Sequence, residues 1–213
     1  MATGVSAPTK GARAAERARG RQPIPDEVID AARQNFLRFG VNRTTMADIA
    51  RAVGTPRQTL YEYVSSRDEL VDAVLVLRIR EIAEALTPSG DEAASFTDAF
   101  VETSTAAITA ARGDHELMNI VATGPIDRVQ DIVTGPHAEV HEIVAHLLEP
   151  ILDRGQATGQ LRADKSRDDI IDWVRIVYLS LISQTSIELE KVSDLVGSFL
   201  LPAIMFDKDA ARR

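Results

Sequence analysis

Apolar residues recur along this chain with the three- to four-residue spacing of helices that pack on one side. The first such stretch runs from Pro25 to Phe39 and puts four apolar residues on one face: Val28, Ala32, Phe36 and Phe39. Strand signals are nearly absent, because the sequence holds no alternating β-branched run and no Asn-Gly turn. The pattern therefore predicts an all-α protein.

A short second helix is predicted after Gly40, a residue that we expect to stop the first helix in the left-handed conformation. Thr45 and Asp48 have the spacing of a capping box, in which each residue satisfies a free backbone N–H of the other. Ile49 lies on the apolar stripe of this helix, and Gly54 ends it.

The third helix is predicted to begin directly after that glycine. Thr55 is the expected cap, Pro56 fits the first helical position, and Gln58 completes a second capping box. Leu60 faces inward and leaves the polar residues of the first turn outside. Ser66 caps a fourth helix that continues to about Leu86.

The remainder reads as a larger helical body. Gly155 and Gly159 are expected in the loop after one of its long helices. The residues from Ile170 to Ile182 are apolar nearly all round, which predicts a helix buried on several sides. The predicted helices cover residues 92–112, 115–122, 137–154, 166–182 and 193–206, with a short piece between Gly124-Pro125 and Gly135-Pro136.

Charge divides the chain in two. Residues 1–64 hold ten Lys and Arg against six Asp and Glu, whereas residues 65–213 hold fourteen against twenty-six, so that the net charge is −8. A basic front on an acidic body suggests two functions, with the front placed on phosphates. Residues 1–22 have no apolar periodicity and are expected to form a disordered basic arm.

Three helices, the last two joined by a tight glycine turn, predict a helix-turn-helix unit. An α-helix fits the major groove of B-form DNA, and its first turn presents side chains to base edges. Three packed helices of an ordinary bundle are the alternative, but the outward face here is polar and carries Arg57. The pattern therefore favours DNA binding.

The segment TTMADIARAVGTPRQTLYEYVSSRDELVDAV resembles the DNA-binding signature of the tetracycline-repressor (TetR) family. Two departures are visible: Val64 stands where Phe is commoner, and Arg67 replaces a Lys. The matching residues are Thr44, Thr45, Asp48, Ile49, Ala50, Gly54, Thr59, Leu60, Tyr61, Tyr63, Ser66, Arg67 and Leu70. Outside residues 22–76, only an all-helical body of similar length resembles the family.

The resemblance implies a homodimeric transcriptional regulator, usually a repressor that a small molecule releases from DNA. It implies base-facing places for Arg57, Gln58 and Tyr61, and phosphate-facing places for Thr45, Thr59, Tyr63 and Arg67. The chemistry agrees, because Arg pairs with guanine and Gln with adenine, while hydroxyls hold phosphate oxygens. Met46 offers at most an apolar base contact. Arg21 in the arm is a candidate for the minor groove, with a solvated tail as the alternative.

These predictions divide the chain into three parts: a basic arm over residues 1–22, a helix-turn-helix domain over 23–66, and a regulatory and dimerisation body over 67–213. The two apolar helices near the end of the chain predict a four-helix bundle between two copies. Its expected interface residues are Val174, Leu181, Val192, Leu195, Val196, Phe199 and Leu200.

A mostly apolar ligand cavity is expected inside the body, because the body is far larger than support of the short helices requires. The inducer should therefore be a mainly hydrophobic small molecule. Core packing is the alternative for each residue assigned to the cavity, and a regulator without an inducer remains open. The expected lining is Phe100, Thr103, Met118, His141, Trp173 and Tyr178.

Other chemistry has little support in the sequence. His137 and His141 have the spacing of a shared metal site, but a third ligand is not evident, so no metal or cofactor is expected. We expect no catalytic residues, since no phosphate loop or nucleophile elbow occurs; an all-helical enzyme or ligand-binding bundle is the rival class. The chain has no cysteine, no apolar leader and no apolar run of membrane-spanning length, so a cytoplasmic protein is expected.

Overall fold

The computed structural model describes residues 22–86, 95–135 and 138–206. Within these ranges the regular structure is helical, apart from a single antiparallel bridge between Leu161 and Met205. The elements are α2 (Asp26–Phe39), the 3-10 turn η1 (Val41–Arg43), α3 (Met46–Val53), α4 (Arg57–Tyr63), α5 (Arg67–Ala85), α6 (Phe96–Gly113), α7 (His115–Thr123), α8 (Ile126–Thr134), α9 (Ala138–Ala157), α10 (Arg167–Ser183), α11 (Leu189–Leu195), the π-helical turn η2 (Val196–Leu200) and α12 (Leu201–Ile204). The predicted all-α class is confirmed.

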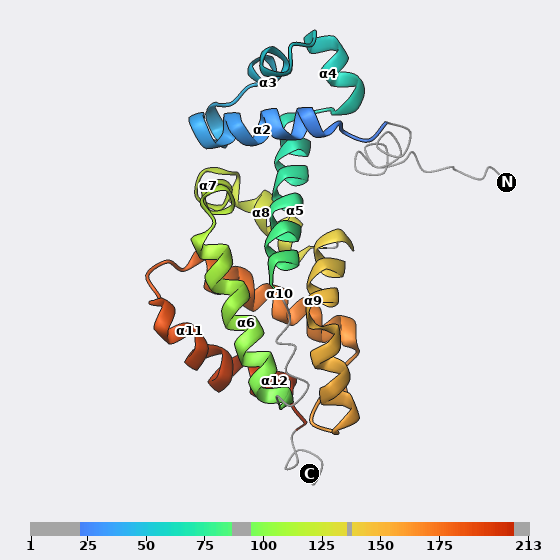
Figure 1. The fold of residues 1–213 in the computed structure, drawn as a ribbon, viewed down its shortest axis with the longest axis vertical. Helices are drawn as coiled ribbons and strands as arrows, with labels where there is room; N and C mark the ends of the chain where they lie inside the picture. The colour runs from blue at the N-terminus through green and yellow to red at the C-terminus, as the bar shows by residue number, and fades with distance from the viewer. Residues whose placement is uncertain (1–21, 87–94, 136–137, 207–213) are drawn as a thin grey trace, which may run out of the picture.

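The molecule is elongated, and α2, α3 and α4 lie together at one end, which we call the small end (Figure 1). Helix α5 leaves this end and runs into the body, where its far half lies beside α6 and α9 and above α10 (Figure 1). Helices α7 and α8 lie between the two ends, beside α5. The only long described connection between the small end and the body is therefore α5.

Two clusters of buried side chains form the core. The first joins the inner faces of α2, α3 and α4 to α5 and then to α7 and α8. The second fills the space between α6, α9, α10 and the last helices. Because Leu70, Val71, Val74 and Leu75 of α5 belong to the first cluster, the small end shares its core with the body. Movement of α5 must therefore reach α2, α3 and α4.

Several predicted helix ends are confirmed. The Thr45 side chain accepts from the Asp48 N–H while Asp48 accepts from the Thr45 N–H, which completes the capping box. Gly54 ends α3 in the left-handed conformation at φ 76° and ψ 23°, a conformation that glycine adopts without a steric penalty. Ser66 caps α5, and Ser166 forms a capping box with Asp169 at the start of α10.

Other helix ends differ from prediction. Pro56 is itself the cap of α4, in extended conformation, and no side chain caps this helix, so the Thr55–Gln58 capping box is wrong. Gly40 has a positive φ of 79° but a ψ of 156°, outside the left-handed helical region. Phe39 lies off the buried face of α2 and is 46% exposed. The apolar period therefore holds to Phe36 and fails at the end of the helix.

Two predictions about the body also need correction. Gly155 lies within α9, which continues to Ala157, and its backbone packs against the ring of Phe96. Helix α10 is not buried on several sides, because Trp173 is 46% exposed and Ile176 is 43% exposed. The predicted helix start near Glu92 and the residues Pro136 and His137 lie outside the described ranges.

Candidate nucleic-acid interface and ligand cavity

Helices α3 and α4 are held on α2 and α5 by a few buried apolar side chains. Ile49 and Ala50 anchor α3, while Leu60 and the adjoining Val64 anchor α4 and its exit. Val64 is fully buried in the place where the family resemblance has Phe, so the smaller side chain still fills a core position. This anchoring leaves the opposite face of α4 in solvent.

The three residues predicted to face bases lie on that exposed face. Arg57, Gln58 and Tyr61 are all exposed, and Arg57 and Tyr61 stand one turn apart. The Nη2 of Arg57 donates to the Tyr61 hydroxyl at 2.9 Å, and its guanidinium carbon lies 5.4 Å from the centre of the tyrosine ring. The phenol therefore orients the guanidinium, and the two side chains form one unit.

The four residues predicted to face phosphates surround this unit less evenly. Thr45 is exposed, Thr59 and Tyr63 are half-buried, and Arg67 at the start of α5 is half-buried too. The Nη1 of Arg67 donates to the carbonyl oxygen of Asn42 at 3.2 Å, and its buried Nε has no partner. Arg67 thus connects α5 to the η1 turn, next to the start of α3.

The hydroxyl proton of Thr45 is already in use, because it donates to Asp48 Oδ2 at 2.6 Å. Hydrogen bonds from the Thr45 side chain and backbone, followed by Arg51, outweigh burial and lower the pKa of Asp48. The Asp48 carboxylate stays ionised and keeps the capping box closed. A phosphate contact from the Thr45 hydroxyl therefore requires this bond to Asp48 to break.

Sequence reasoning missed two exposed arginines near this surface. Arg43 ends the η1 turn, and Arg51 projects from α3 with a side chain that is 77% exposed and paired with Asp48. Both could have been selected from the sequence, because they are basic residues within or next to the predicted helix-turn-helix. Met46, by contrast, is buried in the core, which leaves little of its side chain for an apolar base contact. Arg21 lies outside the described residues.

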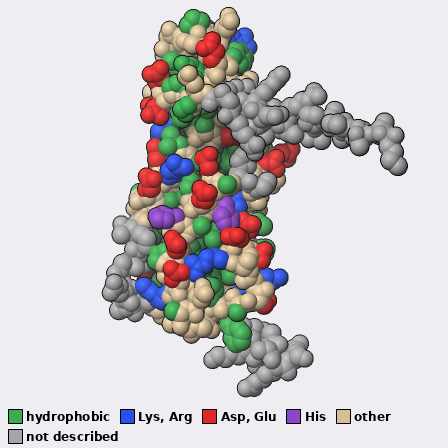
Figure 2. Space-filling view, turned by 90° about the vertical axis from the view of Figure 1, so that its right-hand side faces the viewer, with side chains coloured by type: hydrophobic (Ala, Val, Ile, Leu, Met, Phe, Trp, Pro, Cys, Tyr) green, Lys and Arg blue, Asp and Glu red, His purple; other side chains and the backbone are tan. Residues whose placement is uncertain are grey.

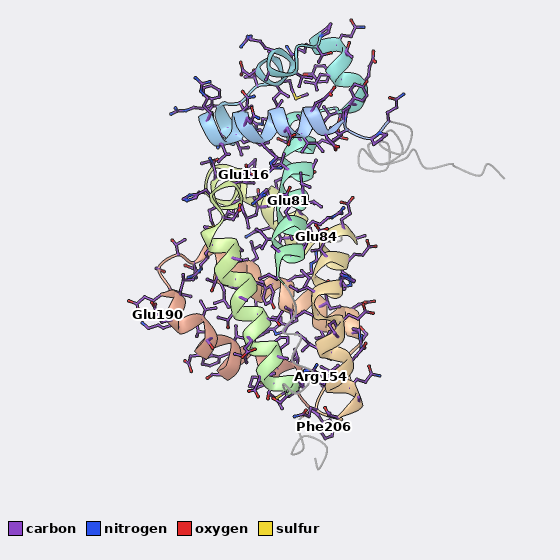
Figure 3. The ribbon with its side chains drawn as sticks, viewed as in Figure 1. Glu81, Glu84, Glu116, Arg154, Glu190 and Phe206 are labelled. Atoms are coloured by element: carbon purple, nitrogen blue, oxygen red, sulfur yellow. The ribbon has the colours of Figure 1, made fainter. Side chains whose placement is uncertain are left out.

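A network of charged side chains joins this end of the molecule to the body (Figure 3). Arg33 of α2 contacts Glu116 of α7 at 2.9 Å and Glu81 of α5 at 3.3 Å. Arg78 of α5 pairs with Asp114 at the start of α7, with Glu81, and with Glu116 at 3.2 Å. The side chains are mostly buried, so solvent screens these pairs less than surface pairs.

Asp114 has two functions in that network, since it also caps α7 by accepting from the backbone N–H of Leu117. Burial on its own raises the pKa of Asp114, but hydrogen bonds from Arg78 and Leu117 outweigh it and leave that pKa lowered. The aspartate is therefore ionised, and its charge helps fix the angle between α5 and α7.

An apolar cavity of about 80 Å³ lies inside the body, beneath the far half of α5. It opens toward a groove of about 540 Å³ between α5 and α9, with which it shares four lining residues. Its lining comes from α5 through α10: Leu75, Ile79, Ile82, Ala83, Leu86, Ala107, Ala111, Leu117, Val121, Val133, Val140, Ile143, Val144, Leu147, Arg175, Tyr178, Leu179 and Ile182.

Of the six residues predicted to line a cavity, Tyr178 lines this one and the other five do not. Phe100 and Thr103 are buried in the second core cluster or beside it, and the Thr103 hydroxyl lacks a partner. Trp173 is exposed, and Met118 lies half-buried on α7. The prediction counted aromatic and polar residues, whereas the cavity wall is aliphatic and carries no comparable signal.

The two polar residues of the wall are Arg175 and Tyr178, one turn apart on α10. Arg175 is 2% exposed and donates to Asp172 at 2.7 Å and to the carbonyl oxygens of Val133 and Gly135 at the end of α8. The Tyr178 hydroxyl donates to Ser104 at 2.8 Å, and burial raises the pKa of that tyrosine. Sequence reasoning missed Arg175, although a lone arginine in an apolar helix was a usable signal.

His141 lies outside the cavity, in a surface groove between α9 and α10. Its Nδ1 lies 2.9 Å from Asp172 Oδ1, and its Nε2 lies 3.4 Å from Asp168. No group of three or more potential metal ligands occurs among the described residues. His137, the other half of the predicted pair, is outside those residues.

Most residues predicted for the dimer interface are packed inside their own protomer. Val174, Leu181, Val192, Val196 and Leu200 are buried, whereas Leu195 is half-buried and Phe199 is 70% exposed. The large apolar side chains that α10 and the helices after it leave exposed are Trp173, Ile176, Leu189, Phe199 and Phe206. The dimer interface itself stays a prediction.

The family match to known proteins lies in the small end and the start of α5. The family model described as "Bacterial regulatory proteins, tetR family" matches residues 28–74, which run from α2 into α5. Residues 28–74 are therefore similar to the bacterial regulatory proteins of the tetR family. The match covers the two residue sets discussed above for bases and phosphates, and it includes none of the residues that line the cavity.

Two curated relatives match shorter parts of the chain at higher identity. The chain is 43% identical over 49 residues to the HTH-type transcriptional regulator TtgR of Pseudomonas putida, which is 23% of each protein. It is 30% identical over 80 residues to the regulator Mb1846 of Mycobacterium bovis, 38% of this chain. The match spans about a third of the length of that relative, 34%.

Over the whole chain, the likeness to solved structures is one of fold. The structure of RolR in complex with resorcinol covers 94% of this chain and 94% of its own, with a TM-score of 0.63 and 17% identity. At that identity the two bodies share an arrangement of helices and not necessarily a ligand. No helix among the described residues has the length and apolar character needed to cross a membrane.

Proposed function

We propose that this protein is a sequence-specific DNA-binding transcriptional regulator that represses transcription until a small molecule releases it from DNA. The observation that carries this proposal is the exposed face of α4, where Arg57, Gln58 and Tyr61 stand clear of the core. These side chains match the donors and acceptors of base edges in the major groove. The tetR-family match over residues 28–74 supports the same function.

Thr45, Thr59, Tyr63 and Arg67 are proposed to hold the phosphates on both sides of that contact. Arg43 and Arg51 add positive charge next to them. Binding of the full chain to labelled DNA across a salt series tests this function. We expect affinity to fall steeply with salt, as released counterions require, and a specific site to be preferred over random DNA. Equal affinity for every sequence would contradict it.

Control by a ligand is proposed from the position of the cavity. Helix α5 packs in the shared core with its first half and lines the cavity with its second half. A ligand that fits one orientation of α5 better than another shifts the equilibrium between those orientations, and only such differential binding has an effect. The Arg33–Glu116 and Arg78–Asp114 pairs carry the change to α2 and α7.

The size of the cavity supports this coupling. An engineered cavity of about 150 Å³ is known to hold benzene, and this one is about half as large, near 80 Å³. A ligand of ordinary size must therefore enlarge the cavity and displace α5 as it enters. A titration of apolar compounds against a labelled operator complex tests the idea. Release of the DNA is expected, and a protein that no compound releases would favour regulation without an inducer.

The regulator is further proposed to act as a homodimer in the cytoplasm, without enzymatic activity. Trp173, Ile176 and Phe199 form an exposed apolar surface on α10 and the last helices, which a second copy would cover. Residues 23–66 and 67–213 are proposed as the DNA-binding and regulatory domains. The boundary falls where α4 ends and α5 begins.

A further inference from the structure

We propose that α7 positions the residues assigned to phosphates, and connects them to the cavity, through two positioning residues near its end, Asn119 and Thr123. This inference rests on the DNA binding and the ligand control proposed above. It adds a second path between the two sites, separate from α5. Three observations carry it: the hydrogen bonds of these two residues, the partner of Arg67, and the opposite side of α7.

The last residue of α7 holds the η1 turn. Helix α7 lies beneath the end of α2 that leads into η1 (Figure 1). The Thr123 hydroxyl accepts from the backbone N–H of Val41 at 3.2 Å, and the Thr123 carbonyl oxygen accepts from the side-chain amide of Asn42 at 2.6 Å. Because Val41 is fully buried, its N–H depends on this hydroxyl and not on water.

Asn119, one turn earlier on α7, holds the end of α2. Its side-chain amide donates to the carbonyl oxygen of Phe36 at 3.2 Å. The Thr123 hydroxyl in turn donates to the carbonyl oxygen of Asn119 at 2.8 Å, which fixes the hydroxyl with its lone pairs toward η1. The two residues therefore hold both the end of α2 and the turn that follows it.

Asn42 extends this contact to the residues assigned to phosphates. Its carbonyl oxygen accepts from Arg67 Nη1 at 3.2 Å, so Asn42 is bonded to α7 on one side and to Arg67 on the other. Arg43 is the next residue of the same turn, and Thr45 caps α3 two positions later. A displacement of η1 therefore moves Arg67, Arg43 and Thr45 together.

The opposite side of α7 lines the cavity. Leu117 and Val121, one turn apart, belong to the cavity wall. Because two residues turn an α-helix by about 200°, this pair lies opposite Asn119 and Thr123. A ligand that displaces α7 as it enlarges the cavity therefore moves η1 without the help of α5.

The body is itself a poor surface for phosphates, so its effect on DNA binding must be indirect. Residues 65–213 hold fourteen Lys and Arg against twenty-six Asp and Glu. Acidic side chains are spread over the face of the body that Figure 2 shows. The uncharged contacts of α7 with η1 let the body control phosphate binding without approaching the DNA.

Substitution of Thr123 tests the positioning role. Thr123→Val keeps the branched shape but removes the acceptor of the Val41 N–H, and we expect DNA affinity to fall about three- to tenfold, equally on all operator variants. The salt slope should stay unchanged, because no phosphate contact is removed, whereas loss of a direct phosphate contact lowers it by about one unit. Thr123→Ser keeps the hydroxyl and should bind within about twofold of the unmodified protein.

Thr134→Val is the matched control. Thr134 ends α8 before a glycine, as Thr123 ends α7, and its hydroxyl donates within α8 to the carbonyl oxygen of Gln130 at 2.9 Å. DNA affinity should not change in this variant. Unchanged affinity or a lowered salt slope for Thr123→Val, or an equal loss with Thr134→Val or Thr123→Ser, would overturn the inference.

Amide hydrogen exchange of the free protein tests the same contact without DNA. The Val41 N–H should exchange at least about tenfold faster in Thr123→Val than in the unmodified protein, and at the unmodified rate in Thr134→Val. Equal rates in all three proteins would refute the contact between α7 and η1. Faster exchange in a protein that prefers no DNA sequence would count against the proposed regulator and not against this contact.

A larger side chain in the cavity tests the path from the ligand site. Val121→Phe stands in for a ligand, since it places a ring on the cavity side of α7. DNA affinity should fall at least about threefold in the otherwise unmodified chain and much less in a chain that carries Thr123→Val, because changes on one path are not additive. Val121→Leu, a smaller enlargement, replaces it if the phenylalanine unfolds the chain. Equal falls in both chains, or no fall in either, would overturn the connection between the cavity and η1.

Discussion

At the scale of single residues, the pairing of Arg57 with Tyr61 decides how α4 presents its donors. A free arginine loses rotamer entropy when it binds a base, but here the tyrosine hydroxyl and ring already restrict the guanidinium. We therefore expect Tyr61 to act on DNA recognition partly through Arg57. Arg67 differs, because its guanidinium is bound to the Asn42 carbonyl and reads no base from that position.

Substitution of these arginines should separate sequence reading from phosphate binding. Arg57→Ala should cost about 1–3 kcal/mol of binding and relax the preference at one base pair. Arg67→Ala should weaken all sequences about equally and lower the salt slope by about one unit. Affinities on a set of single-base operator variants, each measured at several salt concentrations, check both. Uniform loss with both proteins would contradict the assignment.

Asp114→Asn tests the charged junction and predicts a pH dependence. Because the folded pKa of Asp114 is lowered, its ionised form contributes stability above the unfolded value of about 3.9, and this contribution is lost as pH falls through the folded value. Asparagine still caps α7 but leaves Arg78 without that partner. We expect a loss of about 1–2 kcal/mol in the free energy of unfolding at pH 7.

Urea unfolding at a series of pH values measures this difference. The gap between the two proteins should shrink as the pH falls below about 4 and through the lowered folded pKa of Asp114. Asp127→Asn, an exposed aspartate on α8, should show little effect at any pH. A gap for Asp114→Asn that persists unchanged into acid would mean that its charge does not stabilise the fold.

At the scale of elements, the sequence predicts helix ends correctly where they depend on residues nearby in the chain. It fails where the structure depends on packing against residues that are distant in the chain. The capping box of Thr45 with Asp48 and the Gly54 stop depend on neighbours in sequence, and both are confirmed. The sequence predicts a loop at Gly155, yet α9 continues through it and needs a glycine there, because the ring of Phe96 occupies the space of a side chain. Nothing near Gly155 in the sequence reports that ring.

The two candidate sites differ in the same respect, because the exposed face of α4 depends on local sequence and the cavity depends on distant packing. The outward residues of α4 follow from the local inward positions of Leu60 and Val64, so pattern alone located them. The cavity depends on how six helices meet, and aliphatic wall residues have the same composition as any core. Arg175 was overlooked because its partners are carbonyls of α8, about forty residues away in the chain.

Gly155→Ala tests the contact between α9 and α6. An alanine usually stabilises a helix interior by about 1 kcal/mol relative to glycine, but here the added Cβ lies 2.7 Å from two ring carbons of Phe96. Overpacking should win, with a net loss of about 1–3 kcal/mol in thermal or urea unfolding. Gly113→Ala at the end of α6, where a Cβ meets nothing within 4 Å, is the matched control. Equal effects would disprove the close contact.

At the scale of the whole molecule, three candidate functional regions lie along the long axis of the fold (Figure 1). The side chains proposed to read bases occupy one end, the cavity lies beneath the far half of α5, and apolar side chains remain exposed on α10 and the last helices. A second copy on that surface would present two α4 helices at once. Each half-site then contributes to affinity, so a change in their spacing has a large effect on binding.

Phe199→Glu tests the dimer. Phe199 is 70% exposed, and a charge at the centre of a buried interface would be left without a partner. Sedimentation should show a dimer for the unmodified protein at micromolar concentration and a monomer for the variant. Phe39→Glu, at an exposed phenylalanine of α2, should remain dimeric. An unmodified protein that sediments as a monomer would contradict the proposal.

Selection of bound fragments from a random DNA pool by the purified full chain tests the central claim most directly. A dimeric regulator that reads bases with α4 should enrich an inverted repeat, with half-site centres about 34 Å apart, one turn of B-form DNA. The same pool selected with Arg57→Ala should lose preference at one position of each half-site. A pool that stays random, or a preferred sequence without two-fold symmetry, would contradict the account.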